Sequence, residues 1–213
     1  MGRTSAWTRR RGRVGAALLA LASAGLPEPT PAVEPQVIQS ERHAFRVVVL
    51  VEGLENPWGL AFLPDGRLLV TERPGRLRLI ANGTLDPRPI GGLPAIAVQG
   101  TGFRIGEGTA RPDVAPPLHV WVPSIAPSGM AFYGGDRFPR WRGSLFVGAL
   151  VDRSLVRLEL DGERVVREER LMRNAIGRIR DVRAGPDGYL YLLSDASKGV
   201  LARLEPDGVR PRL

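Results

Sequence analysis

The chain repeats, with variations, the stretch Trp58-Gly-Leu-Ala-Phe-Leu-Pro-Asp-Gly-Arg-Leu-Leu-Val-Thr-Glu72, and this repeat indicates the architecture. A looser copy runs Arg180-Asp-Val-Arg-Ala-Gly-Pro-Asp-Gly-Tyr-Leu-Tyr-Leu-Leu-Ser-Asp195. A third, partial copy is divided among Ser128–Phe132, Gly143–Gly148 and Ser154–Gly162. Self-similarity at a spacing of a few tens of residues is typical of repeat architectures such as solenoids and propellers.

Each copy predicts the same unit: an apolar strand, a tight Pro-Asp-Gly turn, a second strand, another turn and a third strand. Pro64 and Pro186 preset the φ that the second turn position needs, while Gly66 and Gly188 accept the positive φ that follows. Further hairpin turns are marked by Asn82-Gly83, Asp161-Gly162 and Asp207-Gly208.

A unit of this kind is a propeller blade. The sequence therefore predicts an all-β fold, a β-propeller that is incomplete because it has about three blades, whereas closed rings typically need at least about four. We also expect Arg46–Val51 to add a strand to the C-terminal repeat, since propellers commonly close by lending a strand from one terminus.

The charge of the chain is concentrated at its start. The formal net charge is +8, but Arg3, Arg9, Arg10, Arg11 and Arg13 precede an apolar run with no acidic residue among them. Without residues 1–24 there remain 25 basic and 22 acidic residues, a net charge of +3. No basic stripe interleaved with aromatic residues remains, so we expect no nucleic-acid partner.

The first 24 residues have the parts of a secretory signal peptide: a basic region, the apolar stretch Val14–Ala22 and small residues at Ala22-Ser-Ala24. The apolar stretch is shorter than the roughly 20 residues of a membrane span, so we expect no stable span after cleavage and a periplasmic or secreted protein; an uncleaved anchor is the alternative. Residues 25–44 are predicted to form a Pro-rich linker. The chain has no cysteine, which excludes disulfides and sulfur-ligated metals.

Three longer stretches resemble a known family. Gly53–Arg76 resembles the first blade of the soluble, pyrroloquinoline-quinone (PQQ)-dependent aldose sugar dehydrogenases, the glucose/sorbosone dehydrogenase family. Trp121–Tyr133 and Gly177–Val182 resemble its last two blades. In the family several more blades lie between, whereas here Gln99-Gly100 is followed within a few residues by Gly106-Glu-Gly-Thr109. The chain thus resembles a member that lacks its central blades.

This gives a division of the chain into a signal peptide (1–24), the linker (25–44), a first blade region (45–100), a junction (101–111) and the last blades (112–213). The resemblance implies oxidation of an aldose by hydride transfer to PQQ, with a histidine as general base and with calcium activating the cofactor. The family's catalytic histidine belongs to the missing blades, so we predict no catalytic residue in this chain. His43 and His119 match no family position, and we expect both to be surface or loop residues.

The resemblance also implies cofactor contacts. Arg178 and Arg180 match the family's Arg-x-Arg pair, which binds the carboxylates of PQQ. Because they alternate about Ile179, both side chains point to one side of a strand; a solvated strand face is the alternative. Weaker matches are Gln99 and Ser124, for which a surface glutamine and a turn serine are the alternatives. Trp121 either covers the cofactor or fills a gap between blades.

No carboxylate cluster with the spacing of a calcium loop is present in the sequence, so we predict no metal ligands, and binding of PQQ and calcium by this chain is in question. Two functions remain open: a sugar dehydrogenase with impaired activity, or a non-catalytic propeller remnant or binding module. Open blade edges make self-association a further possibility.

Overall fold

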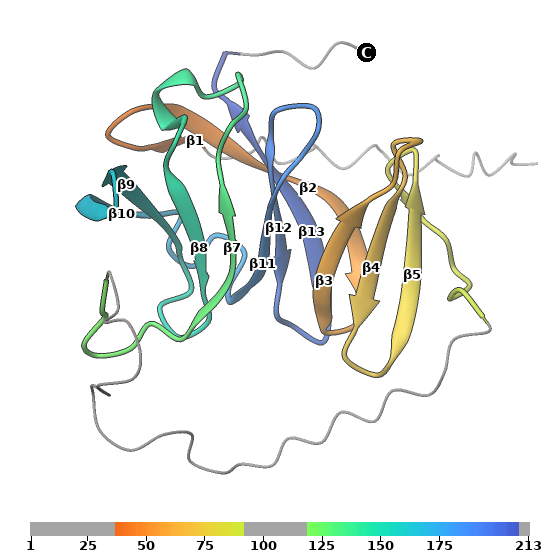
Figure 1. Ribbon diagram of the computed structural model, residues 1–213. Coiled ribbons are helices and arrows are strands. Elements are labelled where there is room, and N and C mark those ends of the chain that lie inside the picture. Colours follow the sequence, from red (N-terminus) through yellow and green to blue (C-terminus); the bar gives the residue numbers. More distant parts are fainter. Residues whose placement is uncertain (1–36, 92–118, 209–213) are drawn as a thin grey trace, which may run out of the picture. The chain divides into compact units, whose positions relative to one another are not determined.

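The computed structural model describes residues 37–91 and 119–208, and this part of the chain is built from antiparallel strands in three sheets (Figure 1). Blade 1 comprises β3 (Pro57–Phe62), β4 (Leu68–Glu72), β5 (Arg76–Ala81) and β6 (Thr84–Leu85). Blade 2 comprises β7 (Pro127–Phe132), β8 (Leu145–Ala149), β9 (Leu155–Asp161) and β10 (Arg164–Leu171). Blade 3 comprises β11 (Ile179–Ala184), β12 (Leu190–Ser194), β13 (Gly199–Pro206), β2 (Ala44–Leu54) and β1 (Val37–Gln39).

The helical content of the described residues is a single 3-10 turn, Pro139–Trp141. The predicted all-β fold of about three antiparallel blades is therefore confirmed, and the partial third copy forms blade 2. The Pro-Asp-Gly turns lie where the sequence predicted them, between β3 and β4 and between β11 and β12. Their glycines have φ of +84° at Gly66 and +81° at Gly188, values that a side chain would disfavour.

The strand β2 completes the C-terminal blade rather than the first one. It pairs antiparallel with β13, with Val47 opposite Leu204 and Val51 opposite Leu201. This confirms the strand exchange predicted for Arg46–Val51. The pairing gives the outer edge of β13 a hydrogen-bonded neighbour and ties the two ends of the described chain into one sheet.

Part of the predicted linker is structured, which corrects its boundary. Val37–Gln39 forms β1 on the outer edge of β2, and the turn that follows is held by a hydrogen bond of 2.8 Å from the Ser40 hydroxyl to the His43 carbonyl. Val37 and Ile38 favour extended backbone, and the free edge of β2 supplies their hydrogen-bond partners. The predicted signal peptide, the rest of the predicted linker and the predicted junction (101–111) lie outside the described residues.

Blade 3 lies between the other two, and a separate apolar core fills each of its faces (Figure 1). On the side of blade 2, blade 3 contributes Leu190, Leu192 and Leu204 to the core. Blade 2 contributes the aromatic side chains of Phe138, Trp141 and Phe146. Leu193 and Leu201 face blade 1, where Leu60, Val70 and Ile80 meet them. The strand Leu190–Ser194 is buried along its whole length because both faces of its sheet are covered.

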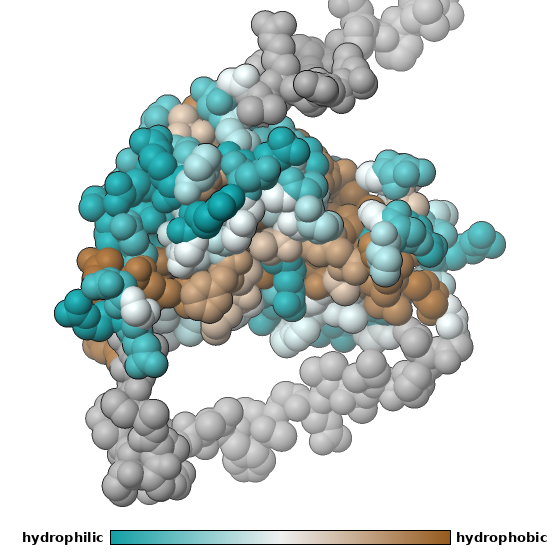
Figure 2. Space-filling view, turned by 45° about the horizontal axis from the view of Figure 1, so that its top comes forward, coloured by the Kyte–Doolittle hydropathy of each residue, from teal (hydrophilic) through white to brown (hydrophobic). Residues whose placement is uncertain are grey.

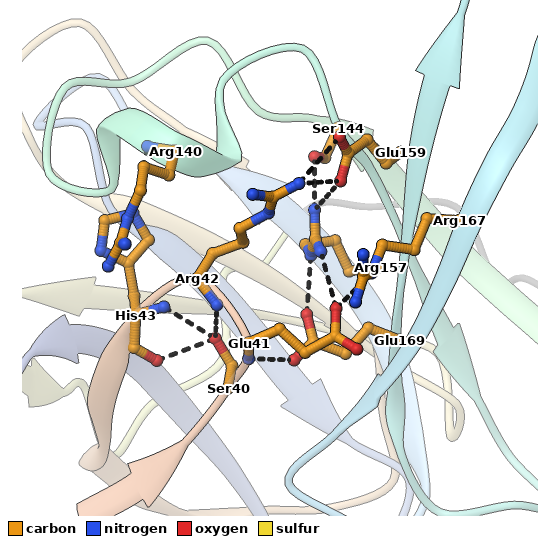
Figure 3. A network of polar contacts seen from close by, with 10 residues as sticks. All are labelled: Ser40, Glu41, Arg42, His43, Arg140, Ser144, Arg157, Glu159, Arg167 and Glu169. Atoms are coloured by element: carbon orange, nitrogen blue, oxygen red, sulfur yellow. Dashed lines mark hydrogen bonds and ion pairs between the residues drawn. The ribbon is translucent and has the colours of Figure 1, made fainter.

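A polar network reinforces the boundary between blades 2 and 3 (Figure 3). Arg157 on β9 is fully buried and donates to the Glu169 carboxylate at 2.9 Å. From the turn before β2, Arg42 pairs with Glu159 at 3.1 Å, and the backbone N–H of Glu41 donates to Glu169 at 2.6 Å. Because β1 and β2 belong to blade 3 and β9 and β10 to blade 2, these contacts fix the two sheets against each other.

Candidate functional site

The first strands of the three blades, β3, β7 and β11, lie next to one another and begin at one end of the structure, which we call the loop end. Hydrogen bonds between loops join the blades there. The N–H of Asn56, just before β3, donates to the Ala196 carbonyl at 2.9 Å, and the N–H of Asn174, before β11, donates to the Arg153 carbonyl at 2.8 Å. Side chains at the starts of these strands are thus held in a fixed relation.

Arg178 and Arg180 meet on one carboxylate at the loop end. Arg178 donates through Nε to Asp195 Oδ2 at 3.0 Å, and its Nη2 lies 3.0 Å from the same oxygen. Arg180 donates through Nη2 to this oxygen at 2.9 Å. The alternation about buried Ile179 places both guanidinium groups on one side, as predicted. Two cations and one anion leave a local net charge of +1, and the Arg178 side chain is 45% exposed.

Sequence reasoning missed Asp195. Its side chain is only 8% exposed, and its own N–H donates to the Arg178 carbonyl at 2.7 Å, which fixes the carboxylate beside the pair. A signal was available: Asp195 directly follows Ser194, the residue opposite Ile179 in the predicted hairpin. A buried arginine needs a carboxylate partner, and this residue stands at the right place in the register.

Arg180 also stacks on an aromatic ring. Its guanidinium carbon lies 4.0 Å from the centroid of the Trp58 ring, and its Nε is buried without a hydrogen-bond partner. This contact forms one wall of a hollow of about 300 Å³ that runs along the first strands, which we call the axial hollow. Its lining includes Trp58 and Gly59 from β3, Ser128 and Gly129 from β7, and Arg180 and Asp181 from β11.

Backbone contact between blades shapes the axial hollow. A Cβ on Gly129 would lie 2.7 Å from the Asp181 Cα, so β7 and β11 approach more closely than a side chain would allow. The Asp181 carboxylate lies against Gly129 through Oδ1 and accepts the N–H of Leu60 through Oδ2 at 2.9 Å. One buried acidic residue thereby joins the first strands of blades 1 and 3.

Trp121 and Ser124 lie in a different hollow, of about 330 Å³, over blade 2. Trp121 Nε1 donates to the Glu168 carboxylate at 3.0 Å, and Ser124 Oγ accepts the N–H of Ala126 at 3.1 Å. This second hollow shares no lining residue with the axial hollow. The structure therefore brings Arg178 and Arg180 together on Asp195, with Arg180 lining the axial hollow. Trp121 and Ser124 come together in the second hollow, and Gln99 lies outside the described residues.

The two histidines of the chain have different surroundings. His119 lines the second hollow, where its Nε2 lies 2.9 Å from Glu168. Burial alone would raise the pKa of Glu168, but hydrogen bonds from Arg170, His119 and Trp121 outweigh it and hold that pKa below its usual value. A histidine oriented by a carboxylate is an arrangement that general bases use, yet neither Arg178 nor Arg180 lines this hollow.

His43 has a packing role. Its ring meets Phe138 and Trp141 edge-on, each at 5.5 Å between centroids, and its Nε2 accepts the N–H of Arg140 at 3.1 Å (Figure 3). Burial, with the nearby positive charges of Arg140 and Arg157, holds the pKa of His43 below its usual value. His43 is thus a loop residue, as expected, and its ring packs against the aromatic side chains between blades 2 and 3.

Among residues 37–91 and 119–208, no three His, Asp or Glu side chains are grouped so that they could hold a metal ion. The same residues contain no helix with the length and apolar character needed to cross a membrane.

Comparison with known proteins defines the family. The profile of the Glucose / Sorbosone dehydrogenase family matches residues 54–103 and 99–203. The chain is 40% identical over 159 residues to the uncharacterized protein slr1608 of Synechocystis sp., an alignment that covers 72% of this chain and 38% of that protein. It is 32% identical over 188 residues to the aldose sugar dehydrogenase YliI of Escherichia coli K12, covering 85% of this chain and 48% of that protein.

The chain thus spans less than half the length of the two curated relatives that it matches. Among solved structures, an oxidoreductase of the glucose dehydrogenase type from Thermus thermophilus is 21% identical, with 75% of this chain and 99% of that chain covered and a TM-score of 0.57. This likeness supports the propeller fold. Because the family profile matches most of the sequence and the blades have the expected architecture, the chain belongs to the glucose/sorbosone dehydrogenase family.

Proposed function

We propose that this chain is an exported member of its family whose loop end retains part of a PQQ site, and that its aldose oxidation is impaired. The observation that carries the proposal is the meeting of Arg178 and Arg180 on Asp195. Two guanidinium groups beside one carboxylate leave a positive charge, and the exposed Arg178 can turn toward an added anion. Arginine suits a carboxylate ligand because its planar fork donates two parallel hydrogen bonds.

These residues fit PQQ only in part. The cofactor carries three carboxylates, whereas the local net charge is +1 and Arg180 is already engaged by Asp195 and Trp58. Bound PQQ would supply the hydride acceptor; Arg178 would orient it, with Ser124, Trp121 and Gln99 as further predicted contacts. Affinity should be weak and should fall with salt, because exposed ion pairs are screened.

No histidine lines the axial hollow: His43 is packed against Trp141, and His119 is bound to Glu168 in the second hollow. The carboxylate that lines the axial hollow, Asp181, already accepts the N–H of Leu60 and pairs with Arg183. General base catalysis typically contributes about 10² to 10⁴-fold to a rate. We therefore expect no aldose oxidation above background. Calcium activation and export to the periplasm or beyond belong to the same proposal, the latter through residues 1–24.

The test has two arms on the purified chain. Dye-linked aldose oxidation is measured with PQQ and calcium supplied and with YliI as positive control; PQQ binding is measured by equilibrium dialysis at low and high salt. We expect no turnover, with weak, salt-sensitive binding that the Arg178→Ala, Arg180→Ala double variant removes. The matched control Arg164→Ala, which removes an exposed arginine of β10, should bind as the wild type does.

Robust turnover that the double variant abolishes would overturn the proposed impairment and would implicate another base, such as His119. Tight binding that the double variant leaves unchanged would refute the proposed site. The second candidate function is a non-catalytic remnant or binding module, which is favoured by the short span of the chain relative to its relatives. Weak binding that depends on Arg178 and Arg180 supports the retained part of a PQQ site, and absence of both binding and turnover identifies a remnant without cofactor function.

A further inference from the structure

Blade 1 has an apolar face that no other blade covers in the described residues. Ala61, Leu69 and Leu79 lie opposite one another across β3, β4 and β5, and Leu77 follows in the next row. Ala61 is exposed and the three leucines are half-buried. The alternate residues, such as Val70 and Ile80, are buried against blade 3. A sheet with one solvated face normally alternates apolar and polar residues, so leucines on both faces indicate a sheet made to be covered twice.

Blade 2 also has a face turned away from blade 3. Met130 pairs with Val147, and Phe132 pairs with Leu145, so the four side chains share this face. Val147 is buried, because Trp121 and Ile125 cover the outer part of the sheet. Met130 and Phe132, on the inner strand β7, remain 58% and 65% exposed. Large exposed apolar side chains at adjacent strand positions mark a contact surface.

The two faces lie on the outer sides of the row of blades. In the space-filling view, hydrophobic surface is visible toward both sides of the row, where Figure 1 shows blade 1 and blade 2 (Figure 2). The positions that define the two faces are all uncharged. They are Ala61, Leu69, Leu77 and Leu79 on blade 1, and Met130 and Phe132 on blade 2. A surface that packs on the blade 1 face therefore has to be apolar, and the blade 2 face meets this requirement.

We propose that two copies of this chain associate about a two-fold axis into a closed ring of six blades, in which blade 1 of each copy packs on blade 2 of the other. Three blades are too few to close, whereas twice three falls within the typical range of about four to eight. This chain matches only 38% and 48% of the length of its two curated relatives. Two copies of the chain therefore supply about as many residues, and so about as many blades, as one chain of a relative.

The two-fold arrangement follows from the geometry of the faces. Within one chain, blade 3 already packs blade 1 on one face and blade 2 on the other, with β11 beside both β3 and β7. The same kind of contact between copies occurs twice in a symmetric dimer and leaves no face free. A contact of blade 1 with blade 1 would leave both copies of Phe132 exposed. This inference does not depend on cofactor binding.

Sedimentation velocity and light scattering over a range of concentrations test the ring. We expect the wild-type chain to have twice the mass of one chain. Leu79→Glu on blade 1 and Phe132→Lys on blade 2 should each give monomers, because a buried unpaired charge disfavours the contact. Val166→Glu is the matched control: Val166 is 54% exposed on the outer strand β10, so this variant should remain a dimer.

Mixing the two monomeric variants identifies which faces meet. If blade 1 contacts blade 2, a mixed pair has one interface with neither substitution and one with both, where the new carboxylate and the new ammonium group oppose each other. Each variant alone has an unpaired charge in both interfaces. We therefore expect the mixture of Leu79→Glu and Phe132→Lys chains to regain dimers, which also shows that both variants fold. A monomeric wild type, a mass that grows beyond two copies, or a mixture of folded variants that stays monomeric would overturn the proposal.

Discussion

Asp195 should contribute strongly to stability, although sequence reasoning did not identify it. The substitution Asp195→Ala removes the carboxylate that Arg178 and Arg180 share. Removing one partner of a buried ion pair typically costs about 3 to 5 kcal/mol, because the other charge is left uncompensated. Arg180 is 15% exposed and keeps its contact with the Trp58 ring, while Arg178 can turn into water. We therefore expect a loss of about 2 to 3 kcal/mol in the free energy of unfolding.

Denaturant unfolding at fixed protein concentration measures this loss, and thermal melts give an independent reading. For a domain of about this size, 1 kcal/mol corresponds to roughly 2 to 4 °C, so the melting temperature should fall by about 4 to 12 °C. The control Asp161→Ala removes a pair with Arg164 in which both side chains are at least 70% exposed. Such surface pairs contribute about 0 to 1 kcal/mol.

A second substitution separates charge from packing. Arg180→Met in the Asp195→Ala background removes the uncompensated cation while keeping much of the apolar stem, so it should recover part of the lost stability. The reasoning would be refuted if Asp195→Ala cost no more than Asp161→Ala, or if the double variant were less stable than Asp195→Ala alone.

Three further predictions concern the contacts between blades. Gly129→Ala should lower the free energy of unfolding by about 1 to 3 kcal/mol, because the new Cβ would meet the Asp181 backbone. The control Gly134→Ala, whose Cβ would have no atom within 4 Å, should leave it unchanged. Equal unfolding midpoints for the two variants would contradict the prediction. Trp141→Ala should cost about 3 to 5 kcal/mol of unfolding free energy, since the ring is fully buried, and a loss below about 1 kcal/mol would show that the core collapses around it. The pKa of His43 is lower in the folded chain than in the unfolded chain, where it is about 6.5. As the pH falls through this value, His43 is protonated more readily in the unfolded chain, so the free energy of unfolding decreases. His43→Phe should lose less unfolding free energy than the wild type between about pH 7.5 and 5.5, and equal losses would argue against the effect.

The blades could be predicted from the amino-acid sequence, because the signals for their strands and turns are local. The Pro-Asp-Gly turns fix backbone angles within three residues, and alternation of apolar side chains specifies strands within five or six. The two arginines about Ile179 could be placed on one side of a strand for the same reason. Even the exchange of β2 was predictable, since its apolar run has strand character and the last repeat lacks a fourth strand.

The surroundings of these residues could not be predicted, because they depend on how the blades pack together. Trp58 stacks on Arg180 from another blade, far away in the sequence, and Asp195 is brought to both arginines by the hairpin between β11 and β12. Trp121 and Ser124, expected near the same cofactor, are held over blade 2 by Glu168 and the turn at Ala126, in another hollow than Arg180. Each of these contacts depends on how one sheet packs against the next. Packing is set by the summed shapes of many side chains, which a local pattern of residues does not specify.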